Sequence, residues 1–291
     1  MSRFPISFGR RDPNGQRRSG LKTRLIIAAV IAGFALFSYY GRPGDENQVT
    51  GEVERVAFDD EADEVKMGLQ AVSEIAKMHG GPSRNGNDQG RVRRIGQRLL
   101  DALDKDLAAK NRRNPYRDYF EFTLLDDEKT VNAFALPGGQ IFITASLYNK
   151  LETEGQLAGV LGHEIGHVIE RHSNQRIAKD QLFQGLAAAG GVAGGDIDSA
   201  RMAQALAQMV SMSYGREDEL ESDKWGVRLT VMAGYDPRAM LGLMKILDEA
   251  SQGQGPPEFM STHPKPANRE AYIEQVIAEE FPQGLPSGLE K

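Results

Sequence analysis

The chain has 291 residues, of which 40% are hydrophobic and 26% charged, so it can bury a core and is not disordered as a whole. It contains no cysteine, which excludes disulfides, thiolate zinc sites and cysteine nucleophiles. The formal net charge is −6, although residues 1–24 carry seven Lys or Arg and one acid. The rest of the chain is therefore strongly acidic, and we expect no nucleic-acid partner for it.

The first predicted element is a membrane-spanning helix. Residues 25–40 read LIIAAVIAGFALFSYY and carry no charge. As a helix this stretch is about 24 Å long, and Lys22 and Arg24 can extend it by snorkelling toward the roughly 30 Å of a hydrocarbon core. Because the basic residues precede it, we expect residues 1–24 to be a cytoplasmic arm and the body to lie across the membrane. A cleaved signal peptide and a buried core helix are the alternatives.

The body is predicted to be mostly helical with one small sheet. A polar linker, 41–57, precedes helical apolar spacing over 58–79 and 91–108. Alternating residues predict a strand over 119–126, and 131–144 read as two short strands around a tight turn at Pro137-Gly138-Gly139. Helices return from residue 145, and the glycine- and alanine-rich stretch 185–198 predicts a flexible joint. We therefore expect an α+β domain over 58–281, with one small antiparallel sheet and a tail, 282–291.

The segment LAGVLGHEIGHVIERHSNQR, residues 157–176, predicts a zinc site. His163 and His167 are four residues apart on one helical face, so both imidazoles can reach one zinc ion per chain at about 2.0–2.1 Å. Glu164 can address a water molecule, accept its proton and pass it to a leaving amine. The alternative is two structural histidines on an amphipathic helix. Gly162 and Gly166 weaken this alternative. Each glycine costs the helix about 1 kcal/mol relative to alanine, and that cost indicates that something approaches this face closely.

Catalytic zinc usually has three protein ligands, so a third must come from elsewhere in the chain. In SYGREDELESDKWG, residues 213–226, Glu219 and Asp223 share a helical face. This spacing favours Glu219 as the third ligand and Asp223 as the partner of a ligand imidazole. Glu217 and Glu221 remain alternative ligands, and a solvated acidic helix face is the competing interpretation.

Two other histidines follow the motif. His263 lies between prolines in MSTHPKPANRE and is either a fourth zinc ligand, a donor to a developing oxyanion, or a surface residue. His172 is rotated off the metal-facing side of its helix, and we expect a structural role for it.

Four segments in order, NAFALPGGQIFIT, LGHEIGHVIERHS, GREDELESD and STHPKPANR, resemble the gluzincin zinc metallopeptidases. That family includes the heat-shock protease HtpX, the CAAX prenyl endopeptidase, the mitochondrial overlapping-activity protease and the periplasmic outer-membrane assembly proteases. The resemblance covers residues 60–280 and implies a zincin-type fold. It also implies that His163, His167 and Glu219 bind zinc, that Glu164 is the general base, and that His263 lies near the metal, where it can occupy the open position.

The resemblance also implies how substrate binds. NAFALP would be an edge strand to which an extended peptide adds, and we expect Asn132 and Ala133 to contact it. A single span is typical of the periplasmic and overlapping-activity branches, which implies a zinc endopeptidase in the bacterial inner membrane, facing the periplasm. Misfolded or misassembled envelope proteins would be its substrates. A zinc-bound assembly factor that cuts little, gated by His263, and a zinc hydrolase of non-peptide substrates are the alternatives.

Overall fold

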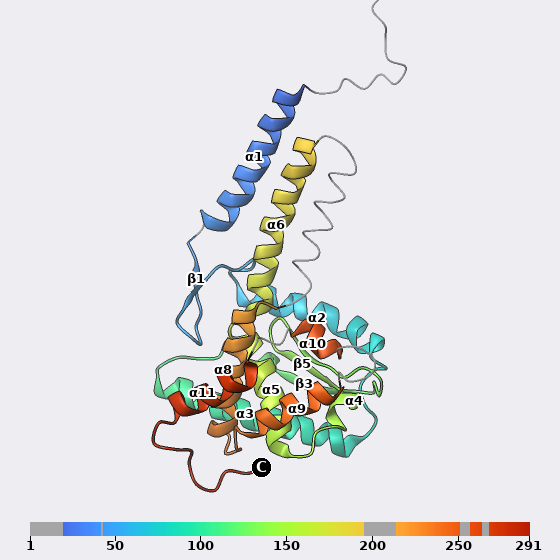
Figure 1. Ribbon diagram of the computed structural model, residues 1–291, viewed down its shortest axis with the longest axis vertical. Helices are drawn as coiled ribbons and strands as arrows, with labels where there is room; N and C mark the ends of the chain where they lie inside the picture. The colour runs from blue at the N-terminus through green and yellow to red at the C-terminus, as the bar shows by residue number, and fades with distance from the viewer. Residues whose placement is uncertain (1–19, 42, 195–213, 251–256, 264–267) are drawn as a thin grey trace, which may run out of the picture.

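The computed structural model describes residues 20–41, 43–194, 214–250, 257–263 and 268–291. Two long helices, α1 (Leu21–Tyr40) and α6 (His172–Gly194), lie side by side and project from a compact body (Figure 1). Among the described residues, α1 is the one helix that is long and apolar enough to cross a membrane. The expected apolar helix is therefore present and begins four residues earlier than predicted.

The body is built mainly of helices around a small sheet, which confirms the expected α+β class. Its remaining elements, in chain order, are β1 (Asp45–Glu46), β2 (Val53–Glu54), α2 (Glu61–Met78), α3 (Gly86–Ala109), η1 (Arg117–Tyr119), β3 (Glu121–Leu125), β4 (Ala133–Leu136), β5 (Gln140–Thr144), α4 (Ala145–Tyr148), α5 (Glu154–Ile169), α8 (Arg216–Met232), α9 (Ala239–Ala250), α10 (Glu258–Thr262) and α11 (Arg269–Glu280).

The three-stranded sheet has the order β3-β5-β4 and is mixed. β4 and β5 form the predicted antiparallel hairpin, with Phe134 opposite Phe142. β3 runs parallel to β5, with Thr123 opposite Phe142, so the expectation of a purely antiparallel sheet is wrong on this point. Alternating side chains identify a strand but do not fix the direction of its neighbour. The predicted linker 41–57 contains the antiparallel pair β1–β2.

Helix α3 shows why the predicted helices form. Its N-cap Asn85 accepts hydrogen bonds from the backbone N–H groups of Asn87 and Asp88. The apolar residues spaced along one face are fully buried, and they are Val92, Ile95, Leu99 and Leu103. This face packs against α5 and β3, so α3 supports the helix that carries the two motif histidines.

The glycine- and alanine-rich stretch is helical as far as the structure describes it. Residues 185–194 continue α6, so the predicted flexible joint is wrong there, and residues 195–198 lie outside the described part of the chain. Glycine lowers intrinsic helix propensity, but tertiary packing can override it. Here α1 packs along α6, and Gly185 touches Ala35.

Candidate active site

Helix α5 carries the motif residues. A capping box stabilises its N-terminus, and helix α8 packs along its side. This capping box joins Thr153 and Gln156. Helix α8 approaches so closely that a Cβ on Gly166 would lie 3.0 Å from the Ser222 Cα, and one on Gly162 would lie 3.3 Å from the Gly226 Cα. The close approach expected from the two helix glycines is therefore that of α8, which brings Glu219 to the histidines.

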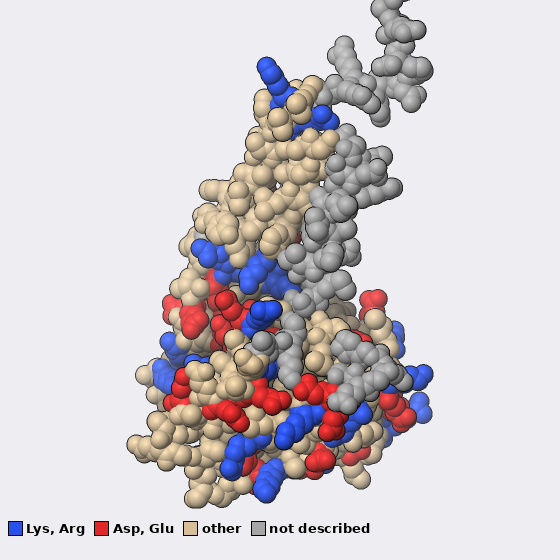
Figure 2. All heavy atoms as spheres, in the orientation of Figure 1, with Lys and Arg blue, Asp and Glu red and all other residues tan. Residues whose placement is uncertain are grey.

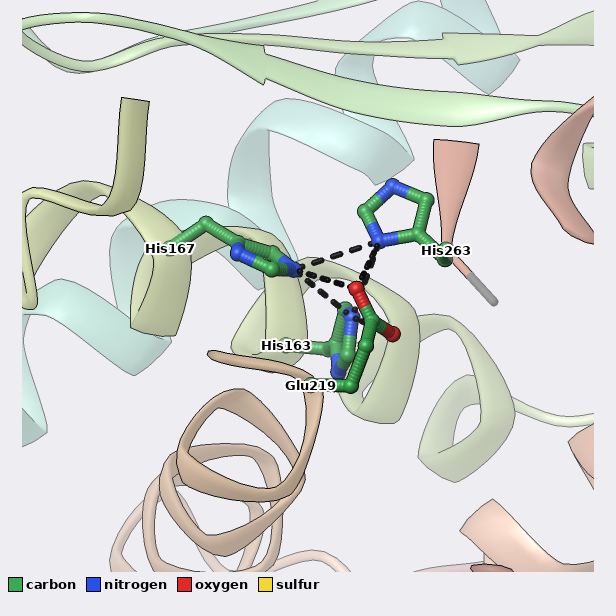
Figure 3. A group of neighbouring side chains, drawn as sticks. All are labelled: His163, His167, Glu219 and His263. Carbon is green, nitrogen blue, oxygen red and sulfur yellow. Dashed lines mark hydrogen bonds and ion pairs between the residues drawn. The ribbon is translucent and has the colours of Figure 1, made fainter. Parts of the chain in front are cut away.

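Four buried side chains from three parts of the chain converge in one cluster: His163, His167, Glu219 and His263 (Figure 3). Their potential ligand atoms all lie within 4.8 Å of one another. The two Nε2 atoms of His163 and His167 are 3.1 Å apart. Glu219 Oε1 lies 3.4 Å from Nε2 of His167, and Glu219 Oε2 lies 3.5 Å from Nε2 of His163. The structure thus brings together the three predicted ligands.

His263 occupies the fourth side of this cluster. Its Nδ1 lies 2.9 Å from Glu219 Oε1 and 3.2 Å and 3.3 Å from Nε2 of His167 and His163. Its Nε2 faces Glu164 Oε1 over 3.6 Å. Neither carboxylate oxygen of Glu164 nor Nε2 of His263 has a hydrogen-bond partner, although all are buried.

These residues fit a metal ion. Buried polar atoms normally have partners, and leaving them without one costs about 1–3 kcal/mol each. Here three imidazole nitrogens and a carboxylate oxygen converge within 4.8 Å of one another. Imidazole and carboxylate are ligands that zinc accepts, and zinc sites combine them.

The electrostatics of the cluster separate the roles of its two glutamates. Burial opposes ionisation of Glu219, but His263 and the motif histidines outweigh it and hold the pKa of Glu219 below its usual range. Burial raises the pKa of Glu164 and prevails over the nearby histidines. Burial also lowers the pKa of His167 well below its usual value, so its ring keeps a free lone pair. An ionised Glu219 suits a ligand, and Glu164 suits a group that takes up and releases a proton.

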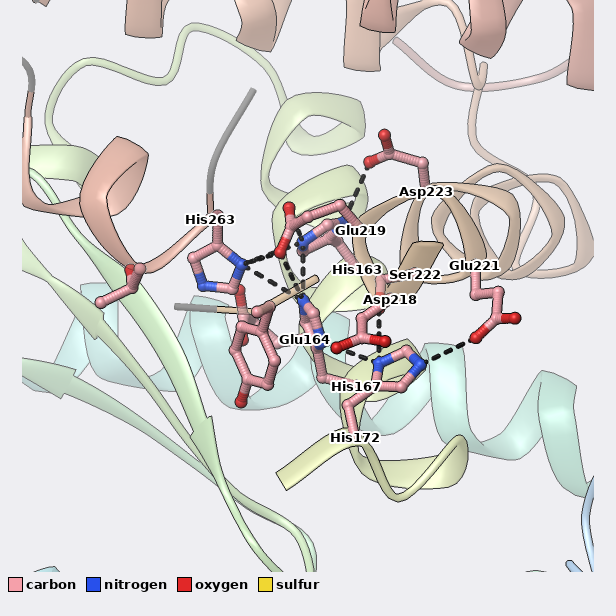
Figure 4. A network of polar contacts seen from close by, with 12 residues as sticks. His163, Glu164, His167, His172, Asp218, Glu219, Glu221, Ser222, Asp223 and His263 are labelled. Atoms are coloured by element: carbon pink, nitrogen blue, oxygen red, sulfur yellow. Dashed lines mark hydrogen bonds and ion pairs between the residues drawn. The ribbon is translucent and has the colours of Figure 1, made fainter. Parts of the chain in front are cut away.

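Behind His163 lies a buried ion-pair network. Asp223 Oδ1 is 3.0 Å from His163 Nδ1, which is the contact predicted for Asp223 (Figure 4). Nε and Nη2 of Arg269 each donate to Asp223 over 2.7 Å, and Nη1 lies 3.4 Å from Glu219 Oε2. Arg269 was not among the predicted site residues. Arg269 is the last residue of the STHPKPANR segment, but no feature of that segment predicts a contact with an acid 46 residues earlier in the chain.

A second chain of contacts supports His167. The Nδ1 atoms of His167 and His172 are 2.9 Å apart, and His172 Nε2 lies 3.0 Å from Glu221 Oε2 (Figure 4). Tyr214 stacks on the His167 ring at 4.0 Å between centroids. Glu221 therefore faces His172 rather than the cluster, and Glu217 is exposed. This leaves Glu219 as the acid of α8 in the cluster.

The two residues predicted to contact substrate are both buried. Ala133 begins β4, an edge strand of its sheet, and Asn132 directly precedes it. The Nδ2 of Asn132 donates to Glu258 Oε1 over 3.2 Å. Nearby, the backbone N–H of Phe259 donates to the carbonyl of Val131 over 3.2 Å. Helix α10 thus covers the start of this edge, and the substrate contact stays a prediction.

Comparison with known proteins matches the region of the cluster. Peptidase family M48 matches residues 87–277. Over 169 residues the chain is 33% identical to the beta-barrel assembly-enhancing protease of Escherichia coli (strain K12), covering 54% of this chain and 34% of that protein. It is 31% identical over 153 residues to the mitochondrial metalloendopeptidase OMA1 of Arabidopsis thaliana, covering 53% and 31%. The S. pombe protein of the same name is 32% identical over 155 residues, covering 52% and 45%. The chain thus spans less than half the length of these relatives.

Proposed function

The chain belongs to peptidase family M48, and from this premise we propose that it is a zinc-dependent endopeptidase with one zinc ion per chain. His163, His167 and Glu219 would hold the ion, and Glu164 would be the general base. The observation that carries the proposal is the convergence of buried imidazole and carboxylate atoms within 4.8 Å, beside a Glu164 carboxylate that lacks a hydrogen-bond partner.

When bound, zinc would supply a Lewis acid that polarises the peptide carbonyl and lowers the pKa of a water molecule. Glu164 accepts a proton from the attacking water and delivers it to the leaving nitrogen, a role that its raised pKa supports. Asp223 holds the His163 ring through Nδ1, and Arg269 keeps Asp223 ionised and in place. The exclusion of bulk water from this buried cluster strengthens each of these interactions.

The placement of His263 supports a gated form of this enzyme. Its ring fills the side of the cluster where a substrate carbonyl would otherwise approach. His263 directly follows α10, the helix that also covers the start of β4 through Glu258 and Phe259. Movement of α10 would therefore free the cluster and the strand edge together. The second candidate function, a zinc-bound assembly factor that cuts little, is the case in which this segment rarely opens.

The proposed substrates are misfolded or misassembled envelope proteins of a bacterium. The support is the similarity to a protease named for the enhancement of β-barrel assembly. We propose that α1 anchors the chain in the inner membrane by a single pass, with the body in the periplasm; removal of α1 as a signal peptide is the alternative. A zinc hydrolase of non-peptide substrates is less favoured, because the edge strand β4 beside the cluster suits an extended peptide backbone.

The proposal is tested by zinc content and casein cleavage of the wild type, Glu164→Gln and His263→Ala, with Glu217→Gln as the control on an exposed acid of α8. We expect about one zinc in each, cleavage by the wild type and the control, and none by Glu164→Gln. Equal cleavage by Glu164→Gln would remove this residue from the mechanism. Faster cleavage by His263→Ala supports gating by His263. Loss of cleavage in this variant means that His263 assists the reaction. Zinc binding without cleavage in every variant favours the assembly factor.

A further inference from the structure

We infer that α6 enters the membrane beside α1, so that residues 181–194 form a second lipid-embedded segment of the chain. This inference rests on the proposed membrane anchor and extends it. Helices α1 and α6 pack along each other in a column that projects from the body (Figure 1). If one helix of such a pair lies in a bilayer, the other shares its surroundings wherever the two lie at the same depth.

Two contacts fix the depth of α6 relative to α1. Toward the base of the column, a Cβ added to Gly185 would lie 2.6 Å from the Ala35 Cβ. At the tip, Nη1 of Arg24 donates to the carbonyl of Gly194 over 3.5 Å. The helices therefore run antiparallel, and the part of α6 between these contacts lies level with residues 24–35. Those residues form the larger part of the proposed membrane span.

The surface of the column suits lipid rather than water. Residues 181–194 carry no charged side chain, and as a helix they are about 21 Å long, too short to cross a roughly 30 Å core alone. The face in Figure 2 shows neither acidic nor basic side chains between the tip of the column and its base. Val30 is 67%, Phe34 72% and Phe183 38% exposed, so apolar groups point outward from both helices. Exposed apolar belts of this kind mark a contact with another apolar phase.

The contact between the two helices has the composition usual within membranes. The buried residues of α1 are Ala28 and Ala35. On the facing part of α6, Ala189 is buried and Gly185 meets Ala35. Small residues let helix backbones approach closely where no hydrophobic effect drives helices together. Large apolar side chains of α1, among them Val30, Phe34 and Phe37, are thus directed outward, whereas Leu182 of α6 is buried.

Both ends of the column carry the residues expected at a membrane surface. Lys22 and Arg24 lie at the tip. At the base, the guanidinium carbon of Arg55 lies 5.9 Å and 5.5 Å from the ring centroids of Tyr39 and Tyr40. Basic and tyrosine side chains are favoured at the level of lipid headgroups. A bilayer, rather than a protein partner, matches this order of basic, apolar and again basic surface.

Insertion of α6 would fix the height of the candidate site above the membrane. His172, the first residue of α6, contacts His167 of the cluster. Gln181, where the lipid-embedded segment starts, follows nine residues later, so at helical rise the cluster lies about 14 Å from that start. The substrates that fit are polypeptide segments exposed close to the membrane surface. The proposed protease would therefore act on chains that are attached to, or emerging at, its own membrane.

The absence of cysteine allows a direct test with single cysteines in the full-length chain. Gly190 on α6, Gly33 on α1 and Gly90 on α3 are matched positions, because each is an exposed helix glycine at which an added Cβ would meet nothing within 4 Å. Each cysteine variant is labelled with bimane and reconstituted in phosphatidylethanolamine–phosphatidylglycerol vesicles. We expect lipids with a nitroxide on the acyl chain to quench the labels at 33 and 190 and to leave the label at 90 unchanged.

The outcomes separate this inference from its premise. Quenching at position 33 with none at 190 overturns the insertion of α6 and leaves the anchor intact. Absence of quenching at both positions overturns the anchor and, with it, the insertion of α6. Neither result bears on zinc content or casein cleavage, which test the proposed enzyme separately.

Discussion

Replacing Arg269 by leucine should destabilise the protein strongly, because this guanidinium neutralises a buried acidic cluster. Arg269 is 2% exposed and donates twice to Asp223 over 2.7 Å, while Glu219 lies 3.4 Å away; both acids are 0% exposed. Removing one partner of a buried ion pair leaves an uncompensated charge and costs about 3–5 kcal/mol. Single domains have only about 5–15 kcal/mol of unfolding free energy in total.

Urea unfolding of the full chain in detergent, with and without a zinc chelator, measures this effect. The matched control is Arg94→Leu, because Arg94 pairs with Glu154 over 2.8 Å with side chains 62% and 30% exposed. Such a surface pair contributes about 0–1 kcal/mol. Asp223→Asn combined with Arg269→Leu should cost less than the sum of the two single changes. A loss for Arg269→Leu no larger than that for Arg94→Leu would refute the argument.

Three further predictions concern a buried acid, a helix glycine and a histidine that contacts the cluster. Burial raises the pKa of Glu54 to about 8, so the folded state holds this proton where the unfolded state releases it, and stability falls as pH rises through 5–8. In the wild type this proton should make the unfolding free energy fall by up to about 1.4 kcal/mol per pH unit, and Glu54→Gln should remove that dependence. If urea titrations gave the same difference in unfolding free energy between wild type and variant at every pH, the prediction would be wrong. An alanine Cβ at position 68 would lie 1.9 Å from the Pro137 carbonyl oxygen, so Gly68→Ala should lower the unfolding free energy by about 1–3 kcal/mol or more. Gly90→Ala, which has open space at its Cβ, should be neutral or stabilising. Equal shifts in melting temperature for the two variants would contradict the close packing of α2 against Pro137. His172→Phe should weaken zinc binding about 10–100-fold, because it removes the partner of His167, a proposed ligand; competition with a chromogenic chelator measures this affinity. Unchanged affinity would remove His172 from the site.

The parts of the site that could be predicted were those set by local helix geometry. The placement of His163 and His167 on one face needs only the spacing of four residues within a helix. The two glycines beside them indicated a close approach, and α8 provides it. The choice among the acids of α8 needed more than spacing. Glu221, two residues after Glu219, points to His172 instead of the cluster.

The parts that escaped prediction depend on tertiary contacts. Arg269 meets Asp223 only because α11 packs on α8, and no periodicity encodes that pairing. The parallel pairing of β3 with β5 depends on the path of the chain between them rather than on the alternation within either strand. The helix of residues 185–194 conflicts with the propensity of its glycines and forms against α1, so a segment near the N-terminus decides its structure.

In the proposed active site, two imidazoles of α5 and one carboxylate of α8 hold a single metal ion. Zinc content and affinity of Glu219→Ala beside Glu217→Ala test this arrangement, since both variants remove one acid from the same helix. The structure places only the first within 3.5 Å of the motif imidazoles. We predict one zinc per chain in the wild type and Glu217→Ala, and loss of tight binding in Glu219→Ala. Full retention of zinc by Glu219→Ala, with wild-type affinity, would contradict the assignment of Glu219 as a metal ligand.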